Sequence, residues 1–209
     1  MYNYIAIEGN IGAGKTTLSN MLSAEMEVTL LLEQFEDNSF LPKFYKEPSR
    51  YAFPLEMSFL ASRFNQLKGK LNNYSLFGDG VIADYCLFKS LVFAKINLED
   101  DEYHLFLKMF EIIDAQIPKP ELIVYLHRPV TKLIQHIVKR GRSYEQDIPP
   151  DYLEQIHEGY MSYLKGLKHQ KVLVLEIDAM DFQHKPEDYI HLKKLLFEPR
   201  EEGIQHYRL

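Results

Sequence analysis

Short hydrophobic runs alternate along this chain with longer segments in which apolar residues recur at the spacing of an α-helix. Each run is brief and almost continuously hydrophobic, which is typical of a strand buried on both faces of a sheet. These runs predict strands at residues 4–7, 28–32, 81–83, 122–126 and 172–177. The longer segments predict helices at residues 16–26, 55–71, 103–117, 130–140 and 152–167.

The alternation of predicted strands and helices indicates an α/β fold. Right-handed crossovers place helices on both faces of such a sheet, so we expect a five-stranded parallel sheet covered on each side. Ligands of these folds bind at the carboxyl ends of the strands. Because the sequence has no repeat, low-complexity tract or flexible linker, residues 1–209 are predicted to form a single domain. Four proline-containing stretches are expected to connect elements, near Pro48, Pro118, Pro149 and Pro186.

Composition excludes several classes of protein. A hydrophobic content of 46% supports one sizeable core, and a formal net charge of -6 disfavours binding to nucleic acid through its phosphates. The single cysteine, Cys86, can form neither an intrachain disulfide nor a cysteine-based zinc site, and the histidines lack metal-ligand spacing. With no targeting segment and no long apolar run, we predict a cytoplasmic protein without membrane association.

A glycine-rich segment directly after the first predicted strand matches the P-loop pattern G-x-x-x-x-G-K-[ST]. In a P-loop the backbone N–H groups surround phosphate oxygens, Lys15 reaches the β- and γ-phosphates of ATP, and Thr16 ligates Mg²⁺. A chance glycine-rich turn is one alternative. A dinucleotide-binding turn is another, but Thr17 stands where its third glycine belongs. The predicted ATP-binding residues of P-loop 9–17 are Gly9, Asn10, Ile11, Gly12, Ala13, Gly14, Lys15, Thr16 and Thr17.

Acidic residues follow the second and third predicted strands, at the same edge of the sheet as the P-loop. Glu33 is the candidate general base, because a carboxylate there could accept the proton of an attacking hydroxyl. A solvated loop acid, grouped with Glu36 and Asp37, is the alternative. Asp84 is the candidate that organises Mg²⁺ and the phosphates together with Thr16.

A cationic segment, Lys139-Arg140-Gly141-Arg142, ends the helical pattern at 130–140. Such a segment can close over ATP as a lid, spanning about 139–150, and neutralise charge on the transferring phosphoryl group. Arg140 and Arg142 are therefore candidate ATP-binding residues, and Arg140 is also a candidate catalytic residue. A helix C-terminus rich in cations and ended by glycine explains the same residues, and both interpretations can hold.

Five segments, taken in order, resemble the deoxynucleoside kinase family, in particular the bacterial deoxyguanosine and deoxyadenosine kinase type. They are residues 33–45, 53–64, 84–85, 139–146 and 152–153. The resemblance implies a P-loop kinase fold with an Arg-rich lid, ATP and Mg²⁺ as cofactors, a nucleoside as the small-molecule substrate, a role in nucleotide salvage and a homodimer built through helices. The apolar faces of 55–67 and 103–117 could supply the dimer contact or pack internally.

The resemblance also implies roles for individual side chains. Glu33 matches the family's catalytic base, which takes the proton of the 5′-hydroxyl. Tyr45 and Glu145 match the pair that holds the 3′-hydroxyl of the deoxyribose. Glu56 and Arg63 fall where the family reads the edge of the nucleobase.

Four positions depart from the family pattern. Tyr85 stands where many members have arginine, Ser90 where some have an acid near the base, and His136 where some have a lid arginine. Tyr85 and Ser90 therefore remain candidates for contact with the nucleoside. Glu56 stands where glutamine is frequent, and a carboxylate offers only acceptors, which match the N1–H and N2–H₂ groups of guanine. This favours deoxyguanosine over deoxyadenosine, with an internal salt bridge from Glu56 to Arg63 as the alternative.

Two other functions fit parts of the sequence. A nucleoside monophosphate kinase of the thymidylate type shares these motifs, but it would need more cations near the acceptor than Lys43, the one in residues 33–44. A catalytically silent structural subunit could keep the fold, but the intact Lys15, Thr16 and Glu33 argue against it. We therefore predict an enzyme that phosphorylates the 5′-hydroxyl of a deoxynucleoside with ATP.

Overall fold

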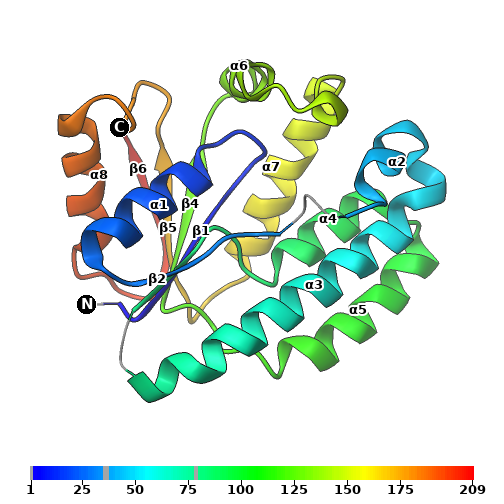
Figure 1. The fold of residues 1–209 in the computed structure, drawn as a ribbon, viewed down its shortest axis with the longest axis horizontal. Helices are drawn as coiled ribbons and strands as arrows, with labels where there is room; N and C mark the ends of the chain where they lie inside the picture. The colour runs from blue at the N-terminus through cyan, green and yellow to red at the C-terminus, as the bar shows by residue number, and fades with distance from the viewer. Residues whose placement is uncertain (1, 35–37, 78–79) are drawn as a thin grey trace.

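The computed structural model describes the backbone of residues 2–34, 38–77 and 80–209, and the side chains of all of these except 72–77. Six strands form one sheet in the order β2-β3-β1-β4-β5-β6 (Figure 1). Every neighbouring pair is parallel, which confirms the predicted parallel sheet. The strands are β1 (Tyr4–Gly9), β2 (Thr29–Leu31), β3 (Val81–Ala83), β4 (Leu122–His127), β5 (Lys171–Glu176) and β6 (Gly203–Arg208).

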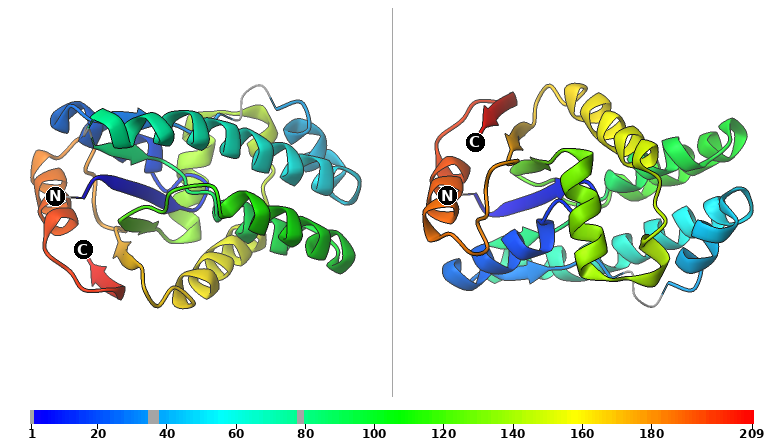
Figure 2. Two further views of the ribbon diagram at one scale, coloured as in Figure 1. Left: turned by 90° about the horizontal axis from the view of Figure 1, so that it is seen from below. Right: turned by 90° about the horizontal axis from the view of Figure 1, so that it is seen from above.

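Helices cover both faces of the sheet, as predicted (Figure 2). On one face α8 packs beside α1, where Tyr189 donates a 2.6 Å hydrogen bond to Glu25. On the other face Tyr160 of α7 donates a 2.8 Å hydrogen bond to Glu8, which is fully buried in β1. The α-helices are α1 (Lys15–Met26), α2 (Leu41–Lys46), α3 (Pro48–Phe77), α4 (Lys89–Asn97), α5 (Asp100–Asp114), α6 (Val130–Arg140), α7 (Pro150–Lys165) and α8 (Pro186–Phe197), and a 3₁₀ turn η1 (Ser143–Glu145) follows α6.

The predicted count of five strands is wrong, because β6 adds a sixth strand at the edge of the sheet. Among the described residues β5 is the one strand that pairs with β6, and no residue of β6 is fully buried. Ile204 and Tyr207 pack against the core, whereas His206 and Arg208 are exposed. An edge strand of this kind lacks the continuous hydrophobic run that marks a strand buried on both faces.

Two of the prolines expected in connections begin helices instead. Pro48 is the first residue of α3 and Pro186 the first residue of α8. Proline suits this position because its fixed φ fits a helix and the first turn of a helix does not use its N–H groups internally. The segments near Pro118 and Pro149 are connections, as predicted.

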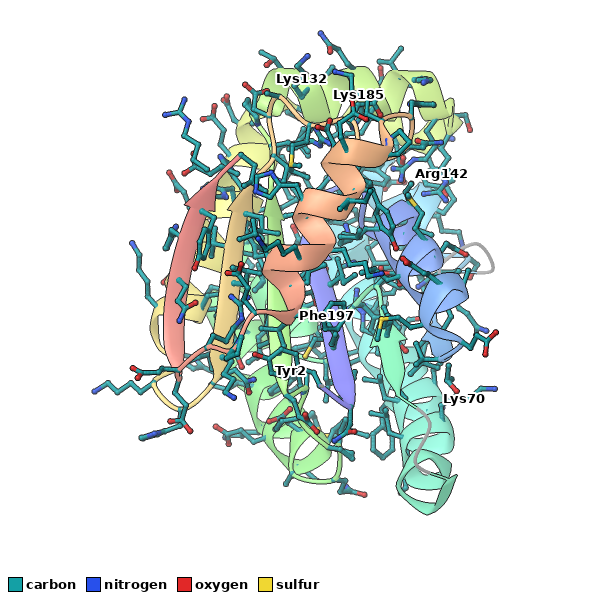
Figure 3. All side chains as sticks on the ribbon, turned by 90° about the vertical axis from the view of Figure 1, so that its left-hand side faces the viewer. Tyr2, Lys70, Lys132, Arg142, Lys185 and Phe197 are labelled. Carbon is teal, nitrogen blue, oxygen red and sulfur yellow. The ribbon has the colours of Figure 1, made fainter. Side chains whose placement is uncertain are left out.

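The carboxyl ends of the strands lie at the end of the molecule that α6 covers (Figure 1). Figure 3 places Lys132 and Lys185 at this end and Tyr2, which precedes β1, well away from it. The residues that follow β1, β2 and β3 therefore meet at one edge of the sheet. Among the described residues, no helix combines the length and apolar character that crossing a membrane requires.

Candidate active site

The P-loop connects β1 to α1 through a turn that is folded around main-chain groups. Gly12 and Gly14 have φ values of 81° and 99°, and a Cβ on Gly12 would lie 2.9 Å from the carbonyl oxygen of Leu133. Both positions therefore require glycine. The Lys15 ammonium donates hydrogen bonds to the carbonyls of Gly9 and Asn10 at 3.0 and 2.8 Å, so it lies across the mouth of the loop.

Asp84 joins the P-loop to the end of β2. Its Oδ2 accepts a 2.6 Å hydrogen bond from the Thr16 hydroxyl, and its Oδ1 accepts a 2.7 Å hydrogen bond from the backbone N–H of Glu33. A hydroxyl and a carboxylate are oxygen ligands of the type that Mg²⁺ prefers, and Mg²⁺ in phosphate sites needs only one or two protein ligands. Thr16 and Asp84 thus fit the predicted ion. No cluster of three or more acidic, histidine or cysteine side chains in the described chain suggests any other metal site.

Glu33 is held between two cations. Nε and Nη2 of Arg63 donate to its Oε1 at 2.8 and 2.5 Å, and Nζ of Lys89 donates to its Oε2 at 2.5 Å. Burial alone would raise the pKa of Glu33, but the charges of Lys89 and Arg63 outweigh it and lower the pKa to about 2. The structure therefore contradicts the alternative of a solvated loop acid for Glu33. Glu36 and Asp37 lie outside the described residues.

Lys89 is a site residue that the sequence reasoning missed. It is 7% exposed and is the first residue of α4. A lysine is unfavourable at a helix N-terminus, where the helix dipole is positive, unless an anion pairs with it. That conflict in the sequence was a signal for a buried acidic partner, which the structure identifies as Glu33.

Glu56 of α3 is 1% exposed and lines the same pocket as Lys15 and Glu33. Its Oε1 accepts a 2.8 Å hydrogen bond from Asn97, whose own Oδ1 accepts one from the Tyr152 hydroxyl at 3.0 Å. No hydrogen bond from any described residue reaches the buried Oε2 of Glu56. Burial raises the pKa of Glu56 to about 7, against the hydrogen bond from Asn97 and the charge of Arg63, which lower it.

The alternative in which Glu56 pairs with Arg63 is wrong. Arg63 donates to Glu33 instead, and its Nη1 donates a 2.6 Å hydrogen bond to Ser90. Tyr85 is fully buried, and its hydroxyl donates to Gln66 at 2.6 Å. Tyr85 and Ser90 are not among the residues that line the pocket. These two predicted substrate contacts thus occupy supporting positions behind the pocket wall.

The predicted sugar and lid residues line the same pocket as Glu56. Glu145 is buried and forms ion pairs with Arg140 and, at 3.4 Å, with Arg142. The Tyr45 ring stacks on Tyr144 with 6.2 Å between ring centroids. Burial, followed by the charge of Glu145, raises the pKa of Tyr45 well above its usual value, so its phenol stays protonated. Gly141 ends α6 with φ of 76°, which turns the chain back toward the pocket.

His136, which stands where some family members have a lid arginine, contacts the P-loop instead. Its Nδ1 lies 2.8 Å from the carbonyl oxygen of Gly12.

Two hollows adjoin at the P-loop. The first, called the acceptor pocket here, extends from Glu33 to Glu56 and also has Phe44, Phe59 and Phe93 in its wall. The second, called the donor groove, runs from the P-loop under α6 to the segment 178–184. The residues shared by both hollows are Gly12, Lys15, Thr16, Arg140 and Arg142.

Arg128 fixes the far wall of the donor groove. Its guanidinium donates to the carbonyl oxygens of Ala13 at 3.4 Å, Ile177 at 2.7 Å and Met180 at 3.1 Å. The P-loop and the segment after β5 are therefore held at a constant separation. A phosphate-binding loop with one hollow on either side is the arrangement expected for a donor and an acceptor of a phosphoryl group.

Comparison with known proteins defines the class. The sequence pattern of the deoxynucleoside kinase family matches residues 5–196, so the chain belongs to this family. It is therefore an enzyme of a family of phosphotransferases, the deoxynucleoside kinases.

Among individual relatives, deoxyguanosine kinase of Bacillus subtilis is 36% identical over 92% of this chain and 97% of its own length. Deoxyadenosine kinase of Dictyostelium discoideum is 30% identical over 93% of this chain and 79% of its own. Two solved structures of deoxyadenosine kinase from M. mycoides, with bound dCTP and with bound dATP, are 26% identical. They superpose with TM-scores of 0.75 and 0.76 and cover 92% of this chain and 98% of theirs. These relatives prefer different bases, so similarity alone does not assign the nucleobase.

Proposed function

We propose that this chain transfers the γ-phosphoryl group of ATP to the 5′-hydroxyl of a purine deoxynucleoside, with deoxyguanosine preferred over deoxyadenosine. The observation that carries the preference is the buried Glu56, whose Oε2 receives no hydrogen bond from the described residues. A second acceptor of this kind, beside the Oε1 that Asn97 orients, matches the two adjacent donors on the guanine edge. The 36% identity to a deoxyguanosine kinase supports the same choice.

In this proposal the nucleoside lies in the acceptor pocket with its base toward Glu56 and its sugar toward the P-loop. Phe44, Phe59 and Phe93 line the pocket and offer apolar ring surfaces to a flat base. Tyr45 and Glu145 hold the 3′-hydroxyl. The 5′-hydroxyl then points toward Glu33, the carboxylate proposed to take its proton.

The triphosphate occupies the donor groove and the P-loop. Lys15 and the loop N–H groups neutralise its phosphates, and Arg140 and Arg142 reach the transferring group from the lid. Thr16 and Asp84 would hold Mg²⁺, which when bound stabilises negative charge on the phosphate oxygens. Glu33 accepts the hydroxyl proton as the 5′ oxygen attacks the γ-phosphorus and ADP leaves.

The acceptor is proposed to be a nucleoside, and a nucleoside monophosphate is disfavoured. Two cations that line the pocket, Arg63 and Lys89, both already pair with the carboxylate of Glu33. An additional phosphate on the acceptor would have to compete with Glu33 for them. This argues against the thymidylate-type alternative.

ATP-dependent phosphorylation of single substrates tests the function. Deoxyguanosine, deoxyadenosine, deoxycytidine, thymidine and dTMP are each incubated with ATP and Mg²⁺, and Lys15→Ala serves as the blank. We expect turnover with both purine nucleosides, fastest with deoxyguanosine. Preference for dTMP would indicate a nucleoside monophosphate kinase instead. Equal turnover of purine and pyrimidine nucleosides would show that Glu56 does not select the base.

We also propose a cytoplasmic homodimer in which residues 1–209 of each copy act as one catalytic domain. Leu55, Leu60 and Leu67 of α3 are buried within the chain. The α5 helix, in contrast, exposes a stripe of Leu105, Met109 and Ile112, which are 53%, 39% and 63% exposed.

Spacings of three and four residues put this stripe on one face of α5, where a second copy could cover it. Light scattering should give twice the chain mass of 24.6 kDa. For the Met109→Lys variant the measured mass should fall to that of one chain. A wild type with the mass of one chain would contradict the dimer.

A further inference from the structure

Lys89 lines the acceptor pocket together with Lys15 and Thr16 of the P-loop. Its ammonium donates to Oε2 of Glu33 at 2.5 Å. Burial, and after it the positive charge of Lys89, lower the pKa of Lys15 to about 8. Lys89 therefore shares one pocket with the group proposed to take the proton and with the P-loop lysine proposed to meet the γ-phosphate.

The contacts of Glu33 conflict with its proposed task. Oε1 already accepts two hydrogen bonds from Arg63, and Oε2 accepts one from Lys89. A general base must offer an oxygen to the incoming hydroxyl at hydrogen-bond distance. Three of about four acceptor positions of the carboxylate are thus taken, and the remaining one is on Oε2, which also accepts from Lys89. One of the two cations has to withdraw before Oε2 is fully open to the 5′-hydroxyl and is relieved of a positive charge that weakens it as a base.

Arg63 is the cation that stays. It makes a third contact with Ser90 at 2.6 Å, and its guanidinium lies 4.8 Å from the centroid of the Phe59 ring. Lys89 also lies over an aromatic ring, that of Phe93 at 5.8 Å, but among the described residues Glu33 is its single hydrogen-bond partner, and its ammonium ends a flexible stem. The cation that can move is therefore Lys89.

We propose that the ammonium of Lys89 moves from Oε2 of Glu33 to the γ-phosphoryl group when ATP binds. The carboxylate is then fully available to the nucleoside only when the phosphate donor is in place. This inference rests on the proposed function and adds a catalytic residue to it. A γ-phosphate carries more negative charge than a carboxylate, so it can compete for the ammonium. In the transfer step the bond from the 5′ oxygen to the γ-phosphorus forms and the bridging bond to ADP breaks. Oε2 takes the hydroxyl proton while Lys89 stays on the phosphoryl oxygens.

If Lys89 moves in this way, the affinity for the nucleoside depends on whether ATP is bound, and binding measurements can detect that dependence. Calorimetry on the wild type would use deoxyguanosine and 2′,5′-dideoxyguanosine, which lacks the 5′-hydroxyl. Each is titrated with and without the non-hydrolysable ATP analogue adenylyl imidodiphosphate and Mg²⁺. We expect the analogue to increase the affinity for deoxyguanosine roughly 5-fold or more beyond the increase for the dideoxy compound, a size typical of coupling between sites. An equal effect on both compounds would overturn the proposal.

Substitution then assigns the coupling to Lys89. In Lys89→Met we expect the extra tightening of deoxyguanosine to disappear and kcat to fall by roughly 10²–10³, as when one preorganised charge is lost, with KM for deoxyguanosine nearly unchanged. Lys89→Arg should recover part of kcat. The matched control is Lys95→Met, an exposed lysine on the same helix whose ammonium also lies over an aromatic ring, that of Tyr103 at 4.7 Å.

The outcomes separate this proposal from the proposed function. A wild type that phosphorylates no deoxynucleoside removes the function itself. A Lys89→Met variant that keeps wild-type kcat, or that changes only KM, removes the role of Lys89 and leaves the function standing. Because the coupling measurement uses the wild type, it decides the matter even if a variant fails to fold.

Discussion

The acceptor pocket and the donor groove meet at the P-loop, yet they are built from different parts. The acceptor pocket contains buried charged side chains, such as Glu56 at 1% and Arg63 at 4% exposure, which Asn97 and Glu33 respectively hold in place. The donor groove combines main-chain groups of the P-loop with cations such as Lys132 and Lys139, which are exposed.

This difference follows from what each hollow has to bind. A triphosphate carries enough charge for backbone N–H groups and solvated cations to hold it. A nucleoside is neutral, so its recognition needs hydrogen bonds from which water is excluded, and an unmatched group there carries a penalty. Substitutions in the acceptor pocket should therefore have larger effects than those on the rim of the donor groove.

The largest effect is expected at Glu33. Glu33→Gln keeps the shape of the side chain but removes the proton acceptor, so kcat should fall by roughly 10²–10⁴. Deoxyguanosine binding, measured by calorimetry, should stay within a few-fold of the wild type. The control is Glu47→Gln, an acid on the surface. Unchanged turnover in Glu33→Gln would remove this residue from the mechanism.

Glu56→Gln should change the choice of base with a smaller effect on overall activity. In the amide, one acceptor oxygen is replaced by a donor NH₂ group. This donor would face a donor on the guanine edge, whereas the adenine edge offers an acceptor to it. The ratio of kcat/KM for deoxyguanosine to that for deoxyadenosine should fall roughly 5- to 150-fold, which corresponds to about 1–3 kcal/mol for an unmatched buried group. Glu154→Gln on the exposed side of α7 is the control. A constant ratio would show that the base is read elsewhere.

The same ratio should depend on pH in the wild type. Burial raises the pKa of Glu56 to about 7, so its carboxylate is ionised above this pH and protonated below it. Deoxyguanosine needs the ionised form, and the ratio should fall about 10-fold between pH 8 and pH 6. Initial rates with both nucleosides at each pH measure it, and groups that affect both substrates cancel. In Glu56→Gln the ratio should not vary with pH, and a similar slope in that variant would contradict the assignment.

The smallest effect is expected on the rim of the donor groove. Lys132 is exposed and lines this groove, so its charge is screened by solvent and salt. Lys132→Ala should raise KM for ATP less than about 3-fold at physiological salt and leave kcat unchanged. Steady-state rates over a range of ATP concentrations provide the measurement. An increase in KM for ATP above 10-fold would contradict this and indicate that Lys132 binds the phosphates directly.

The donor side was predictable from sequence because its determinants are local. The P-loop, Thr16 and the lid each occupy one short segment next to a strand or helix, and the structure brings them together at the carboxyl edge of the sheet. Strands buried on both faces were equally visible as hydrophobic runs. The edge strand β6 was missed because none of its residues is fully buried, so it lacks a continuous hydrophobic run.

The acceptor side was only partly predictable because its contacts join distant segments. Glu33 and Arg63 both line the pocket, but their ion pair joins a strand end to α3 across 30 positions. Lys89 was missed. Arg63 was considered as the partner of Glu56, but the residue that donates a hydrogen bond to Glu56 is Asn97 on α4. Such pairings depend on how helices pack, which motif spacing does not encode.

Direct competition between deoxyguanosine and deoxyadenosine for the wild-type enzyme tests the central claim, that a buried carboxylate in the acceptor pocket selects the base. Both nucleosides are present at equal concentration with ATP and Mg²⁺ at pH 8, and the two monophosphates are separated and quantified. The account predicts that dGMP exceeds dAMP by about 10-fold or more, as expected when a buried polar group discriminates between hydrogen-bonding patterns. Equal amounts, or an excess of dAMP, would contradict it.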